Sequence, residues 1–205
     1  MLFTNGKRFK KYIVTILIGL PTWYLVGILI TFSKEFGVKM NIQGAIDPGK
    51  AVMYSYAAIS VSSLLAGLLS MWLQSRKKVL YLYYAMMSAS VWWFFNLHDA
   101  SLFQFYLVTV VVGIGAGFWT IFVTTAAEQF GTNIRATVAT TVPNMVRGSL
   151  AVIVSPLFVW LQNFTGNYLT AGWVTGVVVI VIGLIAVFMS EETYHKDLDY
   201  IEANV

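Results

Sequence analysis

The hydrophobic residues of this chain gather in long uninterrupted runs rather than alternating with polar residues. Uncharged runs cover residues 12–33, 51–75, 79–97, 102–127 and 148–190. About 20 apolar residues are enough to cross the hydrocarbon core of a bilayer, so each of the first four runs predicts one transmembrane helix. The last run is too long for a single crossing and is interrupted by the polar stretch "QNFTGN" at 162–167. The pattern therefore predicts an all-α polytopic membrane protein with six transmembrane helices.

The breaks between the runs give the expected organisation of the chain. A basic leader occupies 1–11, a six-helix bundle occupies 12–190 and a polar tail occupies 191–205. The expected spans are 12–33, 51–74, 79–97, 102–127, 136–161 and 168–189. The fifth span requires that Arg147 be tolerated inside it. In the loop before the second span, Asp47 is placed to cap the following helix.

Composition supports a membrane protein over a water-soluble one. Hydrophobic residues make up 58% of the chain and charged residues 11%, whereas soluble domains carry roughly 25% charged residues. The mean hydropathy is +0.73. The chain has no cysteine, so disulfides and thiolate metal sites are excluded, and we expect no cofactor.

Basic residues are distributed unevenly between the two sets of predicted loops, which sets the expected orientation. One set contains Lys7, Arg8, Lys10, Lys11, Arg76, Lys77, Lys78, Arg135 and Lys196, and the other contains Lys34, Lys39 and Lys50. The excess places both termini in the cytoplasm, in a plasma membrane or bacterial inner membrane. The net charge of +4 then reports orientation and does not indicate nucleic acid as a partner.

Enzymatic functions find no support in the residues available. His98 and His195 lie in a predicted loop and in the tail, and no HExxH motif occurs, so neither an intramembrane serine protease nor a metalloprotease is expected. Transport is favoured instead, because spans one, four, five and six carry internal glycine or proline, a pattern typical of moving or site-lining helices. The alternative is close helix packing through small residues, as at Gly113 and Gly117.

Three polar segments resemble the cytoplasmic motifs of the major facilitator superfamily (MFS). These are "GLLSMWLQSRKKVL" at 67–80, "AAEQFGTNIRAT" at 126–137 and "SEETYHKDLDYIE" at 190–202. With the order of the spans, they make the chain similar to the C-terminal six-helix half of an MFS transporter of the sugar-porter-like branch. The resemblance implies secondary active transport of a small solute, anionic or sugar-like, by alternating access, with H+ or another ion as the coupling ion.

The chain also departs from the family pattern. Met71 stands where the first motif has an acid, Glu191 stands where the last has a proline, and "GLPTWYLVG" at 19–27 replaces the sugar-porter glutamine motif. The family encloses its substrate between two six-helix halves. We therefore expect either a fragment whose N-terminal half lies elsewhere, or a half-size protein that pairs with a second copy. The alternative function is a non-transporting membrane subunit or regulator.

Arg147 is the first candidate for substrate binding. In a span that begins near 136, it lies at about the bilayer midplane, where an arginine costs roughly 2.5–3.5 kcal/mol. Thr140, Asn144 and Arg147 recur at helical spacing on one polar face, a pattern that predicts a wall facing water or substrate, with Arg147 attracting an anionic group. Trp23 and Trp119 are candidates for stacking on a planar solute. The alternatives are a snorkelling arginine and tryptophans that serve in packing or at the interface.

Glu128, Arg135 and Arg76 are the candidate gating residues. A salt bridge between Glu128 and Arg135 at the cytoplasmic face would be broken and remade during alternating access. The alternative for this pair is orientation in the membrane together with helix capping. Arg76 also has a simpler role as a topology determinant and a contact for lipid phosphates.

Overall fold

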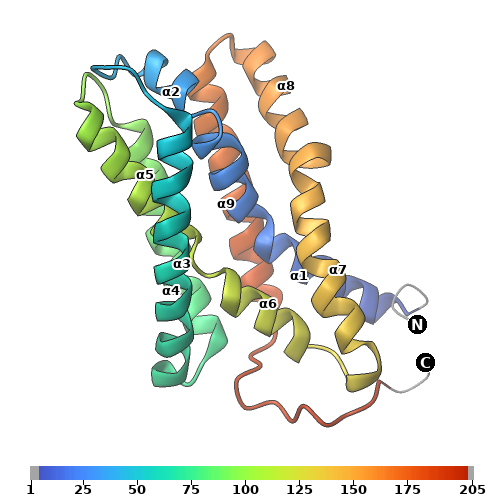
Figure 1. Cartoon of the computed structure of the whole chain (residues 1–205). Coiled ribbons are helices and arrows are strands. Elements are labelled where there is room, and N and C mark those ends of the chain that lie inside the picture. The colour runs from blue at the N-terminus through green and yellow to red at the C-terminus, as the bar shows by residue number, and fades with distance from the viewer. Residues whose placement is uncertain (1–4, 203–205) are drawn as a thin grey trace.

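The computed structural model describes residues 5–202 of the 205-residue chain, and these residues form helices and no strand. Figure 1 shows the helices packed as an elongated bundle. In chain order they are α1 (Gly6–Tyr24), η1 (Leu25–Ile30), α2 (Ser33–Lys39), α3 (Pro48–Leu73), α4 (Arg76–Phe95), α5 (Leu102–Ala116), α6 (Trp119–Glu128), α7 (Thr132–Ser149), η2 (Leu150–Val154), α8 (Ser155–Thr165) and α9 (Tyr168–Met189). The all-α prediction is confirmed.

Five helical stretches within the described chain are long and apolar enough to cross a membrane. They are Gly6–Ile30, Pro48–Leu73, Leu102–Glu128, Thr132–Thr165 and Tyr168–Met189. They coincide with five of the six predicted spans. The remaining predicted span, 79–97, forms the 20-residue helix α4, but the lysines in its first turn and its tyrosines, serines and tryptophans leave it less apolar than the others.

Several boundaries differ from the predicted ones. Helix α1 begins at Gly6, inside the predicted leader, because Asn5 caps it by accepting from the backbone N–H of Lys7 and Arg8. The loop predicted at 34–50 contains α2, and Asp47 caps α3 as expected by accepting from Gly49 N at 2.8 Å. The helix of the fifth predicted span begins at Thr132 rather than 136, because no residue breaks the helix between these positions.

Three of the long stretches contain an irregular segment. The first contains Pro21 and continues into the π-helix η1, in which Thr31 N donates to Val26 O at 3.1 Å. The third is interrupted between α5 and α6 at Gly117. The fourth contains Pro143 and passes through the π-helix η2 into α8. These irregularities fall in three of the four predicted spans that carry internal glycine or proline.

Helix α9 is uninterrupted, and its glycines allow close packing against aromatic rings. A Cβ atom at Gly176 would lie 2.5 Å from the Tyr24 hydroxyl oxygen. Tyr24 and Tyr84 are both buried, and their hydroxyls donate to Gly172 O and Ile18 O, each at 2.7 Å. These contacts fix α9 against α1 and α4, and they match the packing alternative considered for its glycines.

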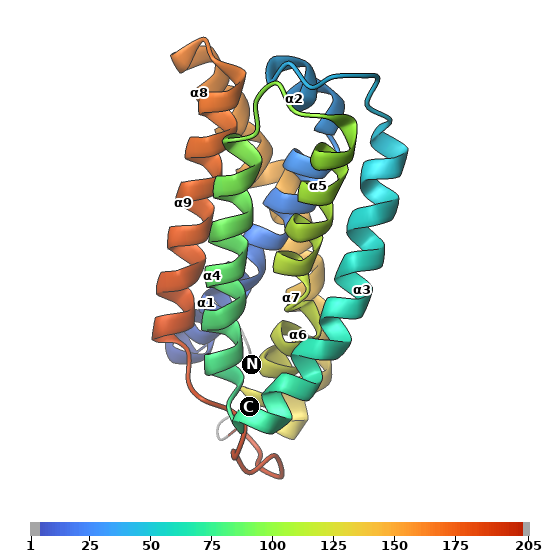
Figure 2. The ribbon, with the colours of Figure 1, turned by 90° about the vertical axis from the view of Figure 1, so that its left-hand side faces the viewer.

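The bundle has two distinct ends. We call "base" the end formed by the turn at Gln74–Ser75, the connection Gln129–Gly131 and the segment after Met189, and "top" the end with α2 and the loop at 96–101. Both ends of the described chain lie at the base (Figure 1), and the turned view in Figure 2 shows α4 and α9 side by side on one flank of the bundle, with α3 on the other. The tail after Met189 is irregular and crosses the base, where Tyr200 O accepts from Thr132 N at 2.8 Å.

Candidate functional site

A recess of about 150 Å³ lies beside the last turns of α1 and α7, where each helix passes into a π-helix. Four helical stretches far apart in the sequence contribute to it. Its lining residues are Thr22, Trp23, Val26, Tyr56, Ile59, Trp119 and Arg147. Apolar side chains predominate, with one permanent charge and a few polar atoms, which is the usual composition of a small-molecule site.

Arg147 and two tryptophans form the polar and aromatic part of this recess. The Arg147 guanidinium carbon lies 5.2 Å from the centre of the Trp23 ring, within the range of a cation–π interaction. The Trp23 and Trp119 rings meet edge to face, with their centres 6.4 Å apart at an interplanar angle of 84°. The ring of Trp23 thus holds the guanidinium at the recess.

Two further polar atoms at the recess lack a hydrogen-bond partner. Thr22 Oγ1 and Trp23 Nε1 are buried, and neither bonds to any atom of the described chain. A buried polar group that is left unpaired typically costs 1–3 kcal/mol, and most such groups in native proteins are satisfied by protein, water or ligand. The pair therefore offers hydrogen bonds to an occupant of the recess.

The charge of Arg147 is not neutralised by the part of the chain that the structure describes. None of the ion pairs within residues 5–202 includes Arg147. The residue lies close to the midpoint of the 34-residue stretch Thr132–Thr165 and on its exposed face. An anionic group from outside the described residues would find an unpaired guanidinium there.

The structure brings together three of the five predicted substrate-binding residues. Arg147, Trp23 and Trp119 all line the recess, although they come from α7, α1 and α6. Asn144 and Thr140 do not line it. Both are exposed on the same helix, and their side chains bond to backbone carbonyls one turn earlier, Asn144 Nδ2 to Thr140 O at 2.8 Å and Thr140 Oγ1 to Ala136 O at 3.0 Å.

Sequence reasoning missed Thr22 and Tyr56. Thr22 sits between Pro21 and Trp23, in the segment that replaces the sugar-porter motif, and that position beside a helix irregularity was the available signal. Tyr56 lies in α3, which carries apolar residues on every side. The sequence pattern therefore could not predict which side of this helix faces the recess.

A second polar cluster lies at the base and centres on Glu128. Arg76 forms a bidentate salt bridge with its carboxylate, in which Nη2 donates to Oε1 at 2.8 Å and Nε donates to Oε2 at 3.2 Å. Both side chains are largely buried, at 16% and 12% exposure. Thr193 Oγ1 donates to Glu128 Oε2 at 2.6 Å, and Arg76 Nη1 donates to Ser70 Oγ at 2.8 Å. The cluster thus ties α3, α4, α6 and the tail to one another.

The prediction that Glu128 pairs with Arg135 is wrong for this structure. Glu128 ends α6 and faces the first residue of α4, Arg76. Arg135 lies beyond the turn at Gly131, and its guanidinium bonds to the backbone carbonyls of Phe130, at 3.1 Å, and Leu198. The change of chain direction between α6 and α7 separates the two side chains. All three predicted gating residues nevertheless lie at the base.

Glu192 caps the N-terminus of α4 from the tail. Its carboxylate accepts from Ser75 Oγ and from the backbone N–H of Arg76, at 2.9 Å, and Lys77, at 3.2 Å. Partial burial by itself raises the pKa of Glu192, but the hydrogen bonds from Ser75, Arg76, Tyr194 and Lys77 outweigh it and hold the pKa below its ordinary value. The negative charge is stabilised because it faces the positive end of a helix.

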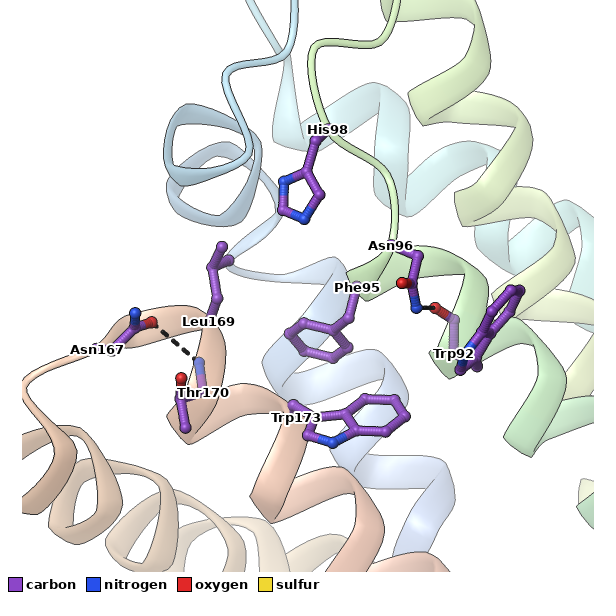
Figure 3. A pocket seen from close by; sticks show the side chains of 8 residues that line it. All are labelled: Trp92, Phe95, Asn96, His98, Asn167, Leu169, Thr170 and Trp173. Carbon is purple, nitrogen blue, oxygen red and sulfur yellow. Dashed lines mark hydrogen bonds between the residues drawn. The ribbon is translucent and has the colours of Figure 1, made fainter.

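A larger hollow of about 500 Å³ lies at the top between α4 and α9. Figure 3 shows His98 above the edge-to-face pair of Phe95 and Trp173, whose ring centres are 5.7 Å apart. Two of the polar side chains around it are already used locally. Asn96 donates to Trp92 O at 2.7 Å, and Asn167 caps α9 by accepting from Thr170 N at 3.0 Å. The hollow is therefore a weaker candidate for recognition than the recess at Arg147.

Comparison with known proteins returns no match: no family model, no curated protein and no solved structure is similar to this chain. The class that the fold defines is a helical protein, with five helices in residues 5–202 that are long and apolar enough to span a membrane.

Proposed function

We propose that this protein is a six-span integral membrane protein that takes part in moving a small anionic solute across a cytoplasmic membrane. The observation that carries the proposal is the guanidinium of Arg147, held on the Trp23 ring in a recess with two unsatisfied polar atoms and without a carboxylate partner in residues 5–202. A carboxylate or phosphate of the solute would pair with Arg147. Thr22 Oγ1 and Trp23 Nε1 would add hydrogen bonds.

In this proposal α4 also crosses the membrane, in addition to the five long apolar stretches. Helix α4 lies beside α9 in the turned view (Figure 2), and its 20 residues are enough to cross a bilayer. Tyr84 near its middle is buried and bonds to Ile18 O of α1. An orientation with the base in the cytoplasm follows from the excess of basic residues there.

A second helical bundle is part of the proposal. The polar face of α7, with Thr140, Asn144 and Arg147, is exposed over the middle of the longest apolar stretch. Charged and polar side chains facing lipid at that depth are unfavourable. A partner bundle, either a second copy or a separate six-helix half as in the MFS transporters, would cover this face and complete the solute site.

The base cluster would act as the cytoplasmic gate in such a pair. Arg76, Glu128 and Thr193 connect helix ends to the tail through short charge-assisted bonds. Rocking of one bundle against another by alternating access requires contacts at one face that break and re-form. The resemblance to the MFS motifs supports this role, with H+ or another ion as the coupling ion.

The proposal is tested with a thermal-shift screen of small anionic and neutral solutes on the purified full chain, repeated with Arg147→Gln. At a concentration of 100 times its Kd, a bound solute stabilises the folded state by about 2.7 kcal/mol. We expect at least one carboxylate or phosphate solute to raise the melting temperature of the wild type and to leave that of Arg147→Gln unchanged. Uptake of that solute into proteoliposomes should be lost in the same variant.

Lys34→Gln is the matched control, because it removes one exposed positive charge at the top of the bundle and leaves the recess intact. It should respond to the solute like the wild type. If Arg147→Gln and the wild type give equal shifts and equal uptake, the assignment of Arg147 is wrong. Binding without uptake would favour a non-transporting subunit.

A further inference from the structure

An apolar trough runs along the outer surface of the bundle between α1 and α9. It has a volume of about 450 Å³, and its lining is almost entirely aliphatic and aromatic. Phe9, Ile13, Leu17, Ile182 and Ile185 are among the residues along its sides. Its length follows the two helices away from the base, the direction in which a lipid acyl chain extends from a membrane surface.

The trough opens at the base into a second hollow of about 410 Å³ with a basic rim. The two hollows share Lys10, Val14 and Met189, so they form one continuous depression. Lys7, Lys10 and Lys11 line the basic part. One end of the depression is thus apolar and the other positively charged, which matches the two ends of an anionic lipid.

Gln129 supplies a separate indication that this basic hollow receives a ligand. Gln129 lines the hollow and is 1% exposed, and its buried Nε2 has no hydrogen-bond partner within the described chain. Its backbone carbonyl is already used by Lys11 Nζ at 3.2 Å and by the Tyr200 hydroxyl at 2.9 Å. A buried amide donor beside lysine side chains is suited to an anionic oxygen.

The acidic residue at the rim leaves two of the lysines available. Glu191 Oε2 lies 3.7 Å from Lys11 Nζ and 3.4 Å from Lys196 Nζ. Lys7 and Lys10 are exposed and form no ion pair with a carboxylate among residues 5–202. The hollow therefore keeps a net positive charge, and Glu191 reduces it.

We propose that the trough between α1 and α9 binds one anionic phospholipid of the cytoplasmic leaflet, with its phosphate at Lys7, Lys10 and Gln129 and an acyl chain between the helices. This inference rests on the membrane location proposed above. It is independent of the recess at Arg147, which lies on another part of α1 and on α7. The lipid would brace α1 against α9 at the base, where the tail also crosses.

The test uses the full chain in phosphatidylcholine nanodiscs that contain a minor fraction of phosphatidylglycerol, with retained lipids counted by native mass spectrometry. The wild type should retain one phosphatidylglycerol in preference to phosphatidylcholine. Lys7→Gln with Lys10→Gln should weaken retention by more than about tenfold, since each lysine near an anionic surface contributes roughly fivefold. Glu191→Gln should strengthen it.

Two matched controls separate a defined site from general charge or hydrophobicity. Lys34→Gln with Lys39→Gln removes the same charge at the top and should leave retention unchanged. Ile185→Trp fills the trough and should weaken retention, whereas Leu184→Trp, on the neighbouring position of α9 outside the trough, should not. Gln129→Met removes the unpaired donor at similar volume and should also weaken it.

Equal retention by the wild type and the Lys7/Lys10 double variant would overturn the proposal, as would equal effects of the base and top charge changes. Competition by inorganic phosphate as effective as that by phosphatidylglycerol would also overturn it, since the ligand would then be a free anion. Failure of the wild type to remain in carbonate-washed membranes would instead contradict the proposed membrane location. These results distinguish the two proposals.

Discussion

At the residue scale, the main feature is the contrast between the surroundings of Arg76 and those of Arg147. Arg76 is paired with a carboxylate at 2.8 Å, so its charge serves to hold helix ends together. Arg147 has an aromatic ring beneath it and no carboxylate partner in the described chain. The first arrangement is self-sufficient, and the second is completed by an external anion.

Thr22→Val tests whether the unpaired hydroxyl in the recess serves a ligand. Valine keeps the shape of threonine and removes a buried polar atom without a partner, so we expect stability to stay unchanged or rise by up to about 1 kcal/mol. Affinity for the anionic solute should fall about tenfold with the loss of one hydrogen bond to a charged group. Tryptophan-fluorescence melting and solute titration measure the two effects.

Thr15→Val is the matched control, because the Thr15 hydroxyl is used within the helix and donates to Lys11 O at 2.8 Å. This variant should lose about 1 kcal/mol of stability and keep its solute affinity. If Thr22→Val is destabilised as much as Thr15→Val and binds solute normally, the Thr22 hydroxyl has a structural partner and no role in recognition.

The ion pair between Arg76 and Glu128 at the base can be tested by charge reversal, with Arg76→Glu, Glu128→Arg and the double variant. Each single change leaves a largely buried charge facing a like charge and should cost at least about 3 kcal/mol. The double variant restores an opposite pair and should recover a large part of that loss. Thermal melting of the four proteins gives the coupling energy directly.

Glu191→Gln provides the reference for an exposed ion pair, since its side chain is 61% exposed. It should change stability by less than about 1 kcal/mol. Additive effects of the two changes at Arg76 and Glu128 would show that the pair does not stabilise the base, and the proposed gate would lose its support.

At the scale of elements, helix ends at the base depend on side chains from distant parts of the sequence. The N-terminus of α4 is covered by Ser75 and Glu192. The turn before α7 is bonded to the tail through Thr132. An irregular segment thereby fixes the ends of two helices, so changes in the tail should be felt in the bundle.

Glu192→Gln should lower the free energy of unfolding at neutral pH by about 0.5–1 kcal/mol, since the carboxylate interacts with the positive end of α4. The pKa of Glu192 is lowered in the folded protein from an ordinary value of 4.5. Its contribution is therefore present above pH 4.5 and is lost as the pH falls through the lowered pKa. The stability curves of wild type and variant should converge in that acidic range.

Ser75→Ala serves as the comparison, because Ser75 Oγ also caps α4 by accepting from Lys78 N at 3.1 Å. The hydroxyl does not titrate, so the capping part of its loss, about 1 kcal/mol, should persist at acid pH, whereas the part that acts through its hydrogen bond to Glu192 should vanish when that carboxylate is protonated. Parallel curves for Glu192→Gln and the wild type down to low pH would contradict the proposed charge interaction.

The sequence predicted single helices better than it predicted their partners. The spacing of Thr140, Asn144 and Arg147 placed one exposed polar face correctly, since helical periodicity is a local property. Neighbours across the bundle could not be read in this way. Thr22 was missed because the contacts that make its position a recess come from three other helices, and Glu128 was assigned the wrong arginine because a turn at Gly131 reverses the chain.

At the scale of the whole molecule, the two ends of the bundle differ in charge and in construction. The base holds the ion pairs of Arg8, Lys11, Arg76 and Lys196 together with the tail. The top is closed by short loops and α2. Basic residues concentrated at one end favour that end in the cytoplasm, which gives the proposed orientation a direct test.

Single cysteines are suited to this test, since the chain has none of its own. Lys39→Cys places a thiol at the exposed end of α2, and Asp197→Cys places one in the exposed tail. A membrane-impermeant maleimide added to intact cells should label Lys39→Cys and spare Asp197→Cys, and permeabilised cells should label both. Labelling of Asp197→Cys in intact cells would reverse the orientation, and labelling of both would contradict membrane insertion.

The two π-helical turns, η1 and η2, have a consequence for how the sequence tolerates length changes. They are neighbours, since a Cβ atom at Gly27 would meet the side chain of Leu150, the first residue of η2. Each residue turns a helix by about 100°. The number of residues in the wide turn therefore determines which side of the following helix points toward the core. Deleting one residue from Leu150–Val154 would leave Arg147 in place and turn Phe158 away from the core. A point substitution in η2 would change only local contacts, whereas a deletion would change which side chains of α8 point toward the core.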